Sequence, residues 1–151
     1  MTIAELVASA GGFESVEEEV ASEYAEKKDL LAALMHQRLL ERPDINALLG
    51  QENLQVMRDN HANHALFMAS LLRHYDPEVL VNSVLWVFRA YRARGFHPNY
   101  WTAQLNAWIA SIEQELSLES AAAILPIYRW MIAHIPQFTH LTDATADQGV
   151  R

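Results

Sequence analysis

The chain has 151 residues, 51% of them hydrophobic and 20% charged, which predicts one folded domain with a packed core. Its formal net charge of −8 opposes binding to the phosphate backbone of nucleic acids. The absence of cysteine excludes disulfides, thiolate metal sites and cysteine nucleophiles. The N-terminal segment lacks the basic region of an export signal, and no apolar run approaches about 18 residues, so we expect a cytoplasmic protein without a membrane span.

Glycine and proline residues fall between long segments of helical periodicity, so the sequence predicts an all-α fold without strands. We expect one bundle of five to six main helices. The expected elements are a short helix after Thr2 ending at Gly11–Gly12, a helix or helix pair from Ser15 to before Pro43, a short turn at 44–50, and helices at 51–75, 77–95, 98–117 and 118–138.

This division predicts an N-terminal arm at residues 1–14, a helical domain at 15–138, and a polar tail or linker at 139–151. The continuity of two helices is left open by the sequence. The acidic run that follows Ser15 favours a helix start, and this helix either continues or breaks near Lys27–Asp29. Pro126 removes a backbone donor, which predicts a kink or a helix start just before it.

One face of the helix at 51–75 carries two histidines a single turn apart. These histidines and the apolar residues around them recur at alternating spacings of three and four, which places them toward the core. His134 occupies the corresponding face of the last helix, so we expect three inward histidines. The members of the first face are Leu54, Met57, His61, His64, Met68, Leu71 and Tyr75.

Inward histidines have two interpretations. Neutral imidazole binds metals and haem iron and responds to pH, so the cluster predicts a ligand site. Alternatively, each is a core residue hydrogen-bonded to a backbone carbonyl or a tyrosine. The sequence contains no Glu-x-x-His pair, no His-Glu-x-x-His motif, no glycine-rich phosphate loop and no Gly-x-Ser-x-Gly elbow. We therefore expect that the protein is not an enzyme.

The order of elements from residue 15 onward resembles that of a globin. The most specific local feature is the segment YRARGFHPNYW at 91–101, which is similar to the globin stretch around the proximal histidine and the helix after it. Tyr91 stands where that histidine is expected, and His61 or His64 resembles the distal position. The chain therefore resembles the non-haem globin-like sensor domains of bacterial stress-signalling proteins, including stressosome N-terminal domains. The helical cap of cobalamin-binding regulators is a comparable match.

The sensor resemblance implies a homodimeric input module whose state is read by a downstream signalling protein or an output domain. It also implies a pocket between the helices at 51–75 and 77–95 that accepts a small apolar or acidic ligand in place of haem. The candidate ligand-binding residues are His61, His64, Met68, Trp86, Tyr91, Trp108 and His134.

The sequence thus predicts a non-enzymatic sensor or regulatory domain, without a cofactor, whose ligand shifts helix packing at a dimer interface. One alternative is a haem-binding gas sensor of the globin type, in which His61, His64 or His134 supplies the axial ligand. Another is a structural helical module for protein–protein contacts whose histidines only pack. This last hypothesis predicts that no cavity of about 300 Å³ or more lies among the helices.

Overall fold

A computed structural model of the chain describes residues 1–143, and within this range the fold is all-α, as predicted, without strands. Five of the eight α-helices have 16 residues or more. The elements are α1 (Ile3–Ser9), the 3-10 turn η1 (Ala10–Gly12), α2 (Glu18–Leu40), α3 (Ile45–Leu49), α4 (Leu54–Arg73), α5 (Pro77–Ala93), α6 (Asn99–Glu115), α7 (Leu118–Ala133) and α8 (Ile135–Leu141).

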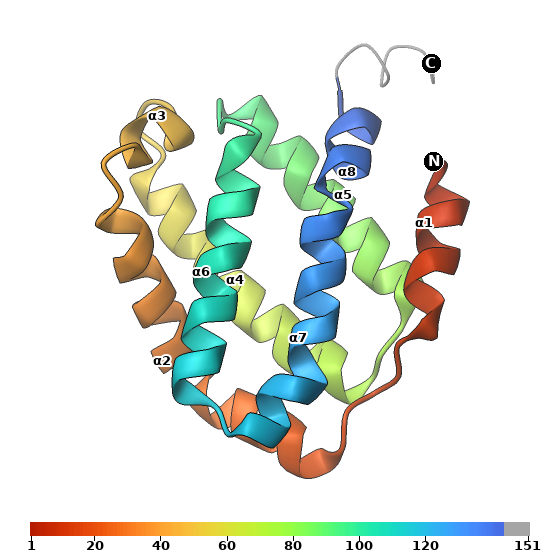
Figure 1. Cartoon of the computed structure of the whole chain (residues 1–151). Coiled ribbons are helices and arrows are strands. Elements are labelled where there is room, and N and C mark those ends of the chain that lie inside the picture. The colour runs from red at the N-terminus through yellow and green to blue at the C-terminus, as the bar shows by residue number, and fades with distance from the viewer. Residues whose placement is uncertain (144–151) are drawn as a thin grey trace.

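The long helices form one bundle around a shared apolar core. In Figure 1, α6 and α7 run antiparallel side by side, and α4 and α5 cross behind them. The long helix α2 packs on both α4 and α6. In contrast, α5 packs chiefly on α1, η1 and α8. No helix within residues 1–143 is long and apolar enough to span a membrane.

The helix starts follow from local capping chemistry. Thr2 and Glu5 form a reciprocal capping box at the start of α1. Asp76 accepts hydrogen bonds from two backbone amides of α5, and Pro77 occupies the first turn, where its missing N–H is not needed. Ser117 caps α7 by accepting from the amide of Ser120. These side chains fix where the helices of the bundle begin.

The helix predicted from Ser15 differs from the prediction at its start. It begins at Glu18, and the side chain of Ser15 instead accepts a hydrogen bond from the amide of Tyr75. Of the two alternatives for its length, the structure has one continuous helix to Leu40, without a break at residues 27–29. Its first turn keeps the acidic residues Glu18 and Glu19, where the helix dipole favours negative charge.

Of the two predicted effects of Pro126, a helix start just before it is wrong. Pro126 lies inside α7, which begins eight residues earlier at Leu118. The helical path is interrupted at His134 instead, because Pro136 in the first turn of α8 has no amide to continue the hydrogen-bond ladder. The helix α8 then extends to Leu141, so the predicted polar tail at 139–151 begins within a helix, and its residues 144–151 lie outside the described part.

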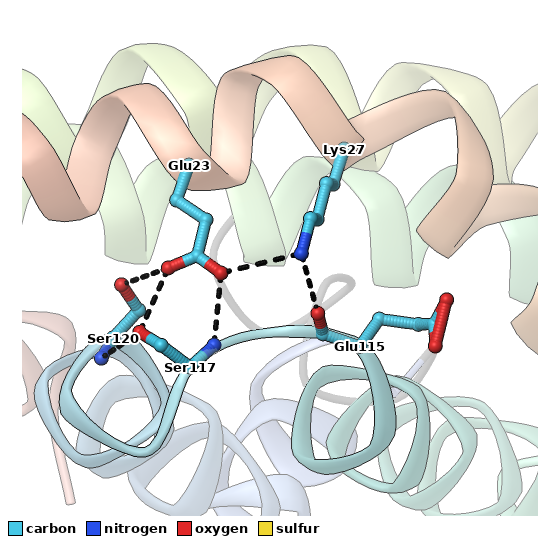
Figure 2. A network of polar contacts seen from close by, with 5 residues as sticks. All are labelled: Glu23, Lys27, Glu115, Ser117 and Ser120. Atoms are coloured by element: carbon cyan, nitrogen blue, oxygen red, sulfur yellow. Dashed lines mark hydrogen bonds and ion pairs between the residues drawn. The ribbon is translucent and has the colours of Figure 1, made fainter.

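The turn between α6 and α7 is attached to α2 by a compact polar cluster (Figure 2). The carboxylate of Glu23 accepts hydrogen bonds from the Ser117 amide at 2.8 Å, the Ser117 hydroxyl at 2.8 Å and the Ser120 hydroxyl at 2.6 Å. Lys27, one turn later, contacts Glu23 at 3.4 Å and donates to the carbonyl of Glu115 at 2.7 Å. An anion thus meets the start of α7 and a cation meets the end of α6, as the helix dipoles require.

A second close contact joins the end of α3 to the turn after α5. Gly50 has a φ of +75°, and a Cβ atom there would lie 2.8 Å from the carbonyl oxygen of Gly95. The side chain of Asn53 donates to the carbonyls of Leu49 and Arg94 at 2.7 and 2.8 Å. Only glycine fits this approach of two backbones, so Gly50 sets where α4 begins relative to α5.

Candidate functional site

A cavity of about 380 Å³ lies between α4, α5 and α6 and reaches α7. The helix α5, which supplies part of the cavity wall, packs chiefly on α1, η1 and α8. The volume is within the range of small-molecule sites. The lining residues are Asn60, Asn63, His64 and Phe67 of α4, Asn82, Ser83, Val84, Trp86, Val87, Phe88 and Tyr91 of α5, Trp101, Gln104 and Leu105 of α6, and Met131 of α7.

Part of the cavity wall is aromatic. The rings of Phe88 and Trp101 stack with their centroids 4.4 Å apart, and Tyr91 lies 5.8 Å from Trp101. Trp86 lines the same cavity but keeps 66% of its surface exposed, so it stands at the rim. Aromatic walls of this kind offer a large apolar contact area to a ligand.

Another part of the cavity wall is polar. Asn60 and Gln104 line it and are only 4% and 2% exposed. Asn60 Oδ1 accepts from the hydroxyl of Tyr100 at 3.2 Å and from Gln104 Nε2 at 3.4 Å. Burial raises the pKa of Tyr91, and the neighbouring amide of Asn60 opposes this shift. The polar part therefore consists of hydrogen-bonding groups that are neutral at pH 7.

Behind this amide pair, His61 links Tyr100 to α2. The hydroxyl of Tyr100 donates to Asn60, so its oxygen accepts from His61 Nε2 at 3.1 Å. The other ring nitrogen, His61 Nδ1, lies 2.8 Å from Nδ1 of His36. A neutral His61 that donates through Nε2 must accept through Nδ1, so the hydrogen-bond pattern assigns the shared proton to His36. A continuous hydrogen-bonded chain thus runs from α2 to the cavity.

His64 is held by a second chain of hydroxyl groups. Its Nε2 lies 2.8 Å from the hydroxyl of Tyr128, which in turn lies 2.9 Å from the hydroxyl of Tyr24. Its ring also packs against Trp108, with centroids 4.6 Å apart. Because Nε2 is engaged, Nδ1 is the ring nitrogen left for contact with the cavity that His64 lines.

Burial determines the charge state of these histidines. It lowers the pKa of His64 to about 3 and, with smaller contributions from the charges of His36 and His64, lowers the pKa of His61 to about 2. Burial, and then the charge of Arg58, also lowers the pKa of His36. His61 and His64 are therefore neutral at pH 7, and neither is poised to titrate within the physiological range.

The structure separates the predicted site residues into three groups. His64, Trp86 and Tyr91 line the cavity. Three others are buried beside it without lining it: His61 at 1% exposed, and Met68 and Trp108 at 0%.

His134 lies elsewhere, so the prediction that three inward histidines share one site is wrong. The ring of His134 stacks on Trp130 with centroids 4.5 Å apart, and its Nδ1 donates to the Trp130 carbonyl at 2.7 Å. Its Nε2 lies 3.3 Å from the hydroxyl of Ser9. The interruption of the helix at this residue turns it toward the N-terminal arm. His134 thus has the backbone carbonyl partner, and His61 and His64 the tyrosine partners, that the core interpretation predicted.

The sequence did not identify the amides of the cavity. Asn60 precedes His61 and lies one turn before His64, so its place beside the histidine face was a usable signal. Gln104 lies between the apolar residues Ala103 and Leu105, and nothing in that pattern marks it as part of a site. Such residues are found only when α4 and α6 are placed against each other.

Comparison of the chain with protein-family models, with curated proteins and with solved structures finds no match in any of the three. The described residues also contain no group of three or more His, Asp or Glu side chains arranged to hold a metal ion. The function is therefore inferred from the chemistry of the cavity.

Proposed function

We propose that this chain is a non-enzymatic sensor or regulatory domain that binds a small, largely apolar molecule in the cavity between α4, α5 and α6. The observation that carries the proposal is the cavity itself, about 380 Å³ in volume, with a largely apolar and aromatic lining and a few polar groups. Ligand sites commonly combine these features. A purely structural module predicted no cavity of about 300 Å³ or more, so the volume favours ligand binding.

The packing of α5 supports a sensing role for such binding. This helix supplies Trp86, Phe88 and Tyr91 to the cavity but packs chiefly on α1, η1 and α8. A ligand that fills the cavity would add contacts between α5 and the α4–α6 pair, and it would favour arrangements of α5 that maximise these contacts. The conformational response is therefore expected in α5 and in the elements that it touches.

The signal would be transmitted through a homodimer to a signalling partner or an output domain. Two large apolar side chains on helices that line the cavity are largely exposed and thus available for a protein contact: Trp86 of α5 at 66% and Leu66 of α4 at 60%. Light scattering of the purified protein should give the mass of a dimer. A monomer at all accessible concentrations would contradict this part of the proposal.

Ligand binding is tested with N-phenyl-1-naphthylamine, a neutral probe whose fluorescence increases in apolar sites. Val87 lines the cavity, so Val87→Phe should fill part of it and lower the probe affinity about tenfold or more. Val79→Phe is the matched control, since Val79 is 46% exposed on the same helix and lies outside the cavity. No probe binding to the wild type, or equal effects of the two substitutions, would contradict the proposal.

The geometry favours a ligand other than haem. Of the three histidines that could supply an axial nitrogen, only His64 lines the cavity, and with its Nε2 engaged by Tyr128 it offers only Nδ1, the nitrogen next to the side-chain attachment and therefore the more hindered one. Titration with haem should therefore give no sharp Soret band. A Soret band that is lost in His64→Ala would overturn the non-haem proposal in favour of a haem-binding sensor.

A further inference from the structure

The cavity has a second property that restricts its ligand: none of the described residues lining it carries a charge. Its polar groups are those of asparagine, glutamine and serine, the hydroxyl of Tyr91, the indole N–H groups of Trp86 and Trp101, and the neutral His64. An anionic ligand would lose its hydration on entry without gaining a lysine or arginine partner. The net charge of −8 adds to this penalty. The site thus selects against the acidic ligand that the sensor resemblance implies.

The two buried amides present a matched pair of hydrogen-bonding atoms to the cavity. With Asn60 Oδ1 and Gln104 Nε2 bonded to each other, Gln104 Oε1 has no partner among the described residues. Asn60 Nδ2 carries two N–H groups, and the neighbouring Tyr91 hydroxyl takes at most one of them. Neither atom is among the fully buried polar atoms that lack a partner, and both residues line the cavity.

This pairing does not depend on how the two amides are oriented. If both are turned over, Asn60 donates to Gln104, and the atoms left over are Asn60 Oδ1 and Gln104 Nε2. In either case one donor and one acceptor, on neighbouring side chains, remain for a ligand. Buried polar groups are normally satisfied, so an open donor and acceptor at 4% and 2% exposure call for a partner in the cavity.

We propose that the ligand of this cavity is an uncharged molecule with an apolar body and one group that presents a hydrogen-bond donor beside an acceptor, as a carboxamide does. The inference rests on the proposed function, since it assigns the chemistry of the molecule that the same cavity would bind. Asn60 and Gln104 bind the polar group, and the aromatic wall of Phe88, Tyr91 and Trp101 contacts the apolar body.

Three probes that share one ring system test this assignment: 2-naphthamide, 2-naphthoate and 2-methylnaphthalene. Equilibrium dialysis against the full chain at pH 7.5 gives the affinity of each. We expect 2-naphthamide to bind at least tenfold more tightly than either of the others, because 2-naphthoate has no cation to meet and 2-methylnaphthalene leaves both amides unpaired. This comparison uses the unaltered protein, so it does not depend on how any variant folds.

Substitution of the glutamine then identifies the residue responsible. Gln104→Met keeps the length of the side chain and removes its polar atoms, so the affinity for 2-naphthamide should fall about tenfold, while that for 2-methylnaphthalene changes less than threefold. Ile109→Met is the matched control, because Ile109 is a partly buried apolar residue of the same helix and does not line the cavity. It should preserve the order and spacing of the three affinities.

The outcomes separate this inference from the proposed function. If 2-methylnaphthalene binds as tightly as 2-naphthamide, the cavity binds apolar molecules but the amide assignment is wrong. Tightest binding of 2-naphthoate would also overturn the assignment, as would an equal loss for 2-naphthamide and 2-methylnaphthalene in Gln104→Met. If none of the three probes binds, the inference and the proposed function both fail.

Discussion

The clearest test of the energetics of this fold is the substitution Glu23→Gln. The Glu23 carboxylate accepts three hydrogen bonds from Ser117 and Ser120 and contacts Lys27, so it joins α2 to the α6–α7 turn (Figure 2). The glutamine side chain would keep the shape of glutamate but lose its charge. Its amide nitrogen, a donor, would then stand where a carboxylate oxygen now accepts hydrogen bonds. The variant should therefore fold but be less stable.

The expected loss follows from the pKa of this carboxyl. The hydrogen bond from Ser120, with further contributions from Ser117 and Lys27, outweighs burial and lowers the pKa of Glu23 from 4.5 to about 2. One pKa unit, a tenfold change in proton affinity, corresponds to about 1.4 kcal/mol. The shift of the Glu23 pKa thus gives an upper value of roughly 3 kcal/mol for the contribution of this carboxylate to the free energy of unfolding. Because 23% of the side chain is exposed, solvent screening reduces this to roughly 2 kcal/mol. A loss of that size lowers the Tm by about 4–8 °C.

Urea unfolding measured between pH 7 and pH 3 tests both the size and the sign of this effect. The pKa of Glu23 is lower in the folded chain, so its contribution is complete above about pH 4.5 and is lost as the pH falls toward 2. The stability difference between wild type and Glu23→Gln should therefore shrink below pH 4.5. Glu26→Gln, at an exposed position of the same helix, should cost little. A difference that stays constant to pH 3, or an equal cost at Glu26, would refute this reasoning.

Three further predictions concern the histidine chain and the backbone. Tyr128→Phe leaves the partners of this hydroxyl on His64 and Tyr24 unpaired, so it should cost about 1–3 kcal/mol in urea unfolding; a cost below about 0.5 kcal/mol would contradict the assigned chain. Gly50→Ala places a Cβ 2.8 Å from the Gly95 carbonyl oxygen at a positive φ, and we expect a loss above about 1 kcal/mol by the same assay, whereas an unchanged stability would show that the turn relaxes freely. Burial lowers the pKa of His64 to about 3, so the contribution of this residue to stability is complete above about pH 6.5 and is lost as the pH falls toward 3. The substitution His64→Gln should therefore weaken the dependence of the unfolding free energy on pH between about 6.5 and 4.5. An unaltered slope in this range would contradict the prediction.

The parts of the fold that could be predicted are those governed by local periodicity. The histidine face of α4 is an example, because spacings of three and four place His61 and Met68 on the buried side whatever the partner helix is. The same rule fails at the helix end, where Leu54 is 50% exposed although it belongs to the predicted face. A residue in the first turn of a helix can lie beyond the ends of the helices that pack against it. The spacing pattern holds no information on how long those neighbouring helices are.

The parts that could not be predicted depend on contacts between distant segments. The histidine partners Tyr100 and Tyr128 lie on α6 and α7, 39 and 64 residues from His61 and His64, and no local pattern pairs them. Likewise, Pro136 rather than Pro126 interrupts the last helical segment. A proline inside a helix removes one hydrogen bond, and whether packing offsets that loss is a tertiary property.

The histidines that first suggest a reactive site instead make the cavity suitable for recognition. His61 orients Tyr100, Tyr100 orients Asn60, and Asn60 orients Gln104, so the amides at the cavity are held by a chain that begins at His36 on α2. Groups that are already fixed lose less conformational entropy when a ligand binds. Burial lowers the pKa of His61 to about 2 and also lowers the pKa of His36, so both histidines of this chain are neutral at pH 7. If the cavity binds the proposed ligand, these histidines would serve specificity, and the neutral amides that they position would determine the choice of ligand.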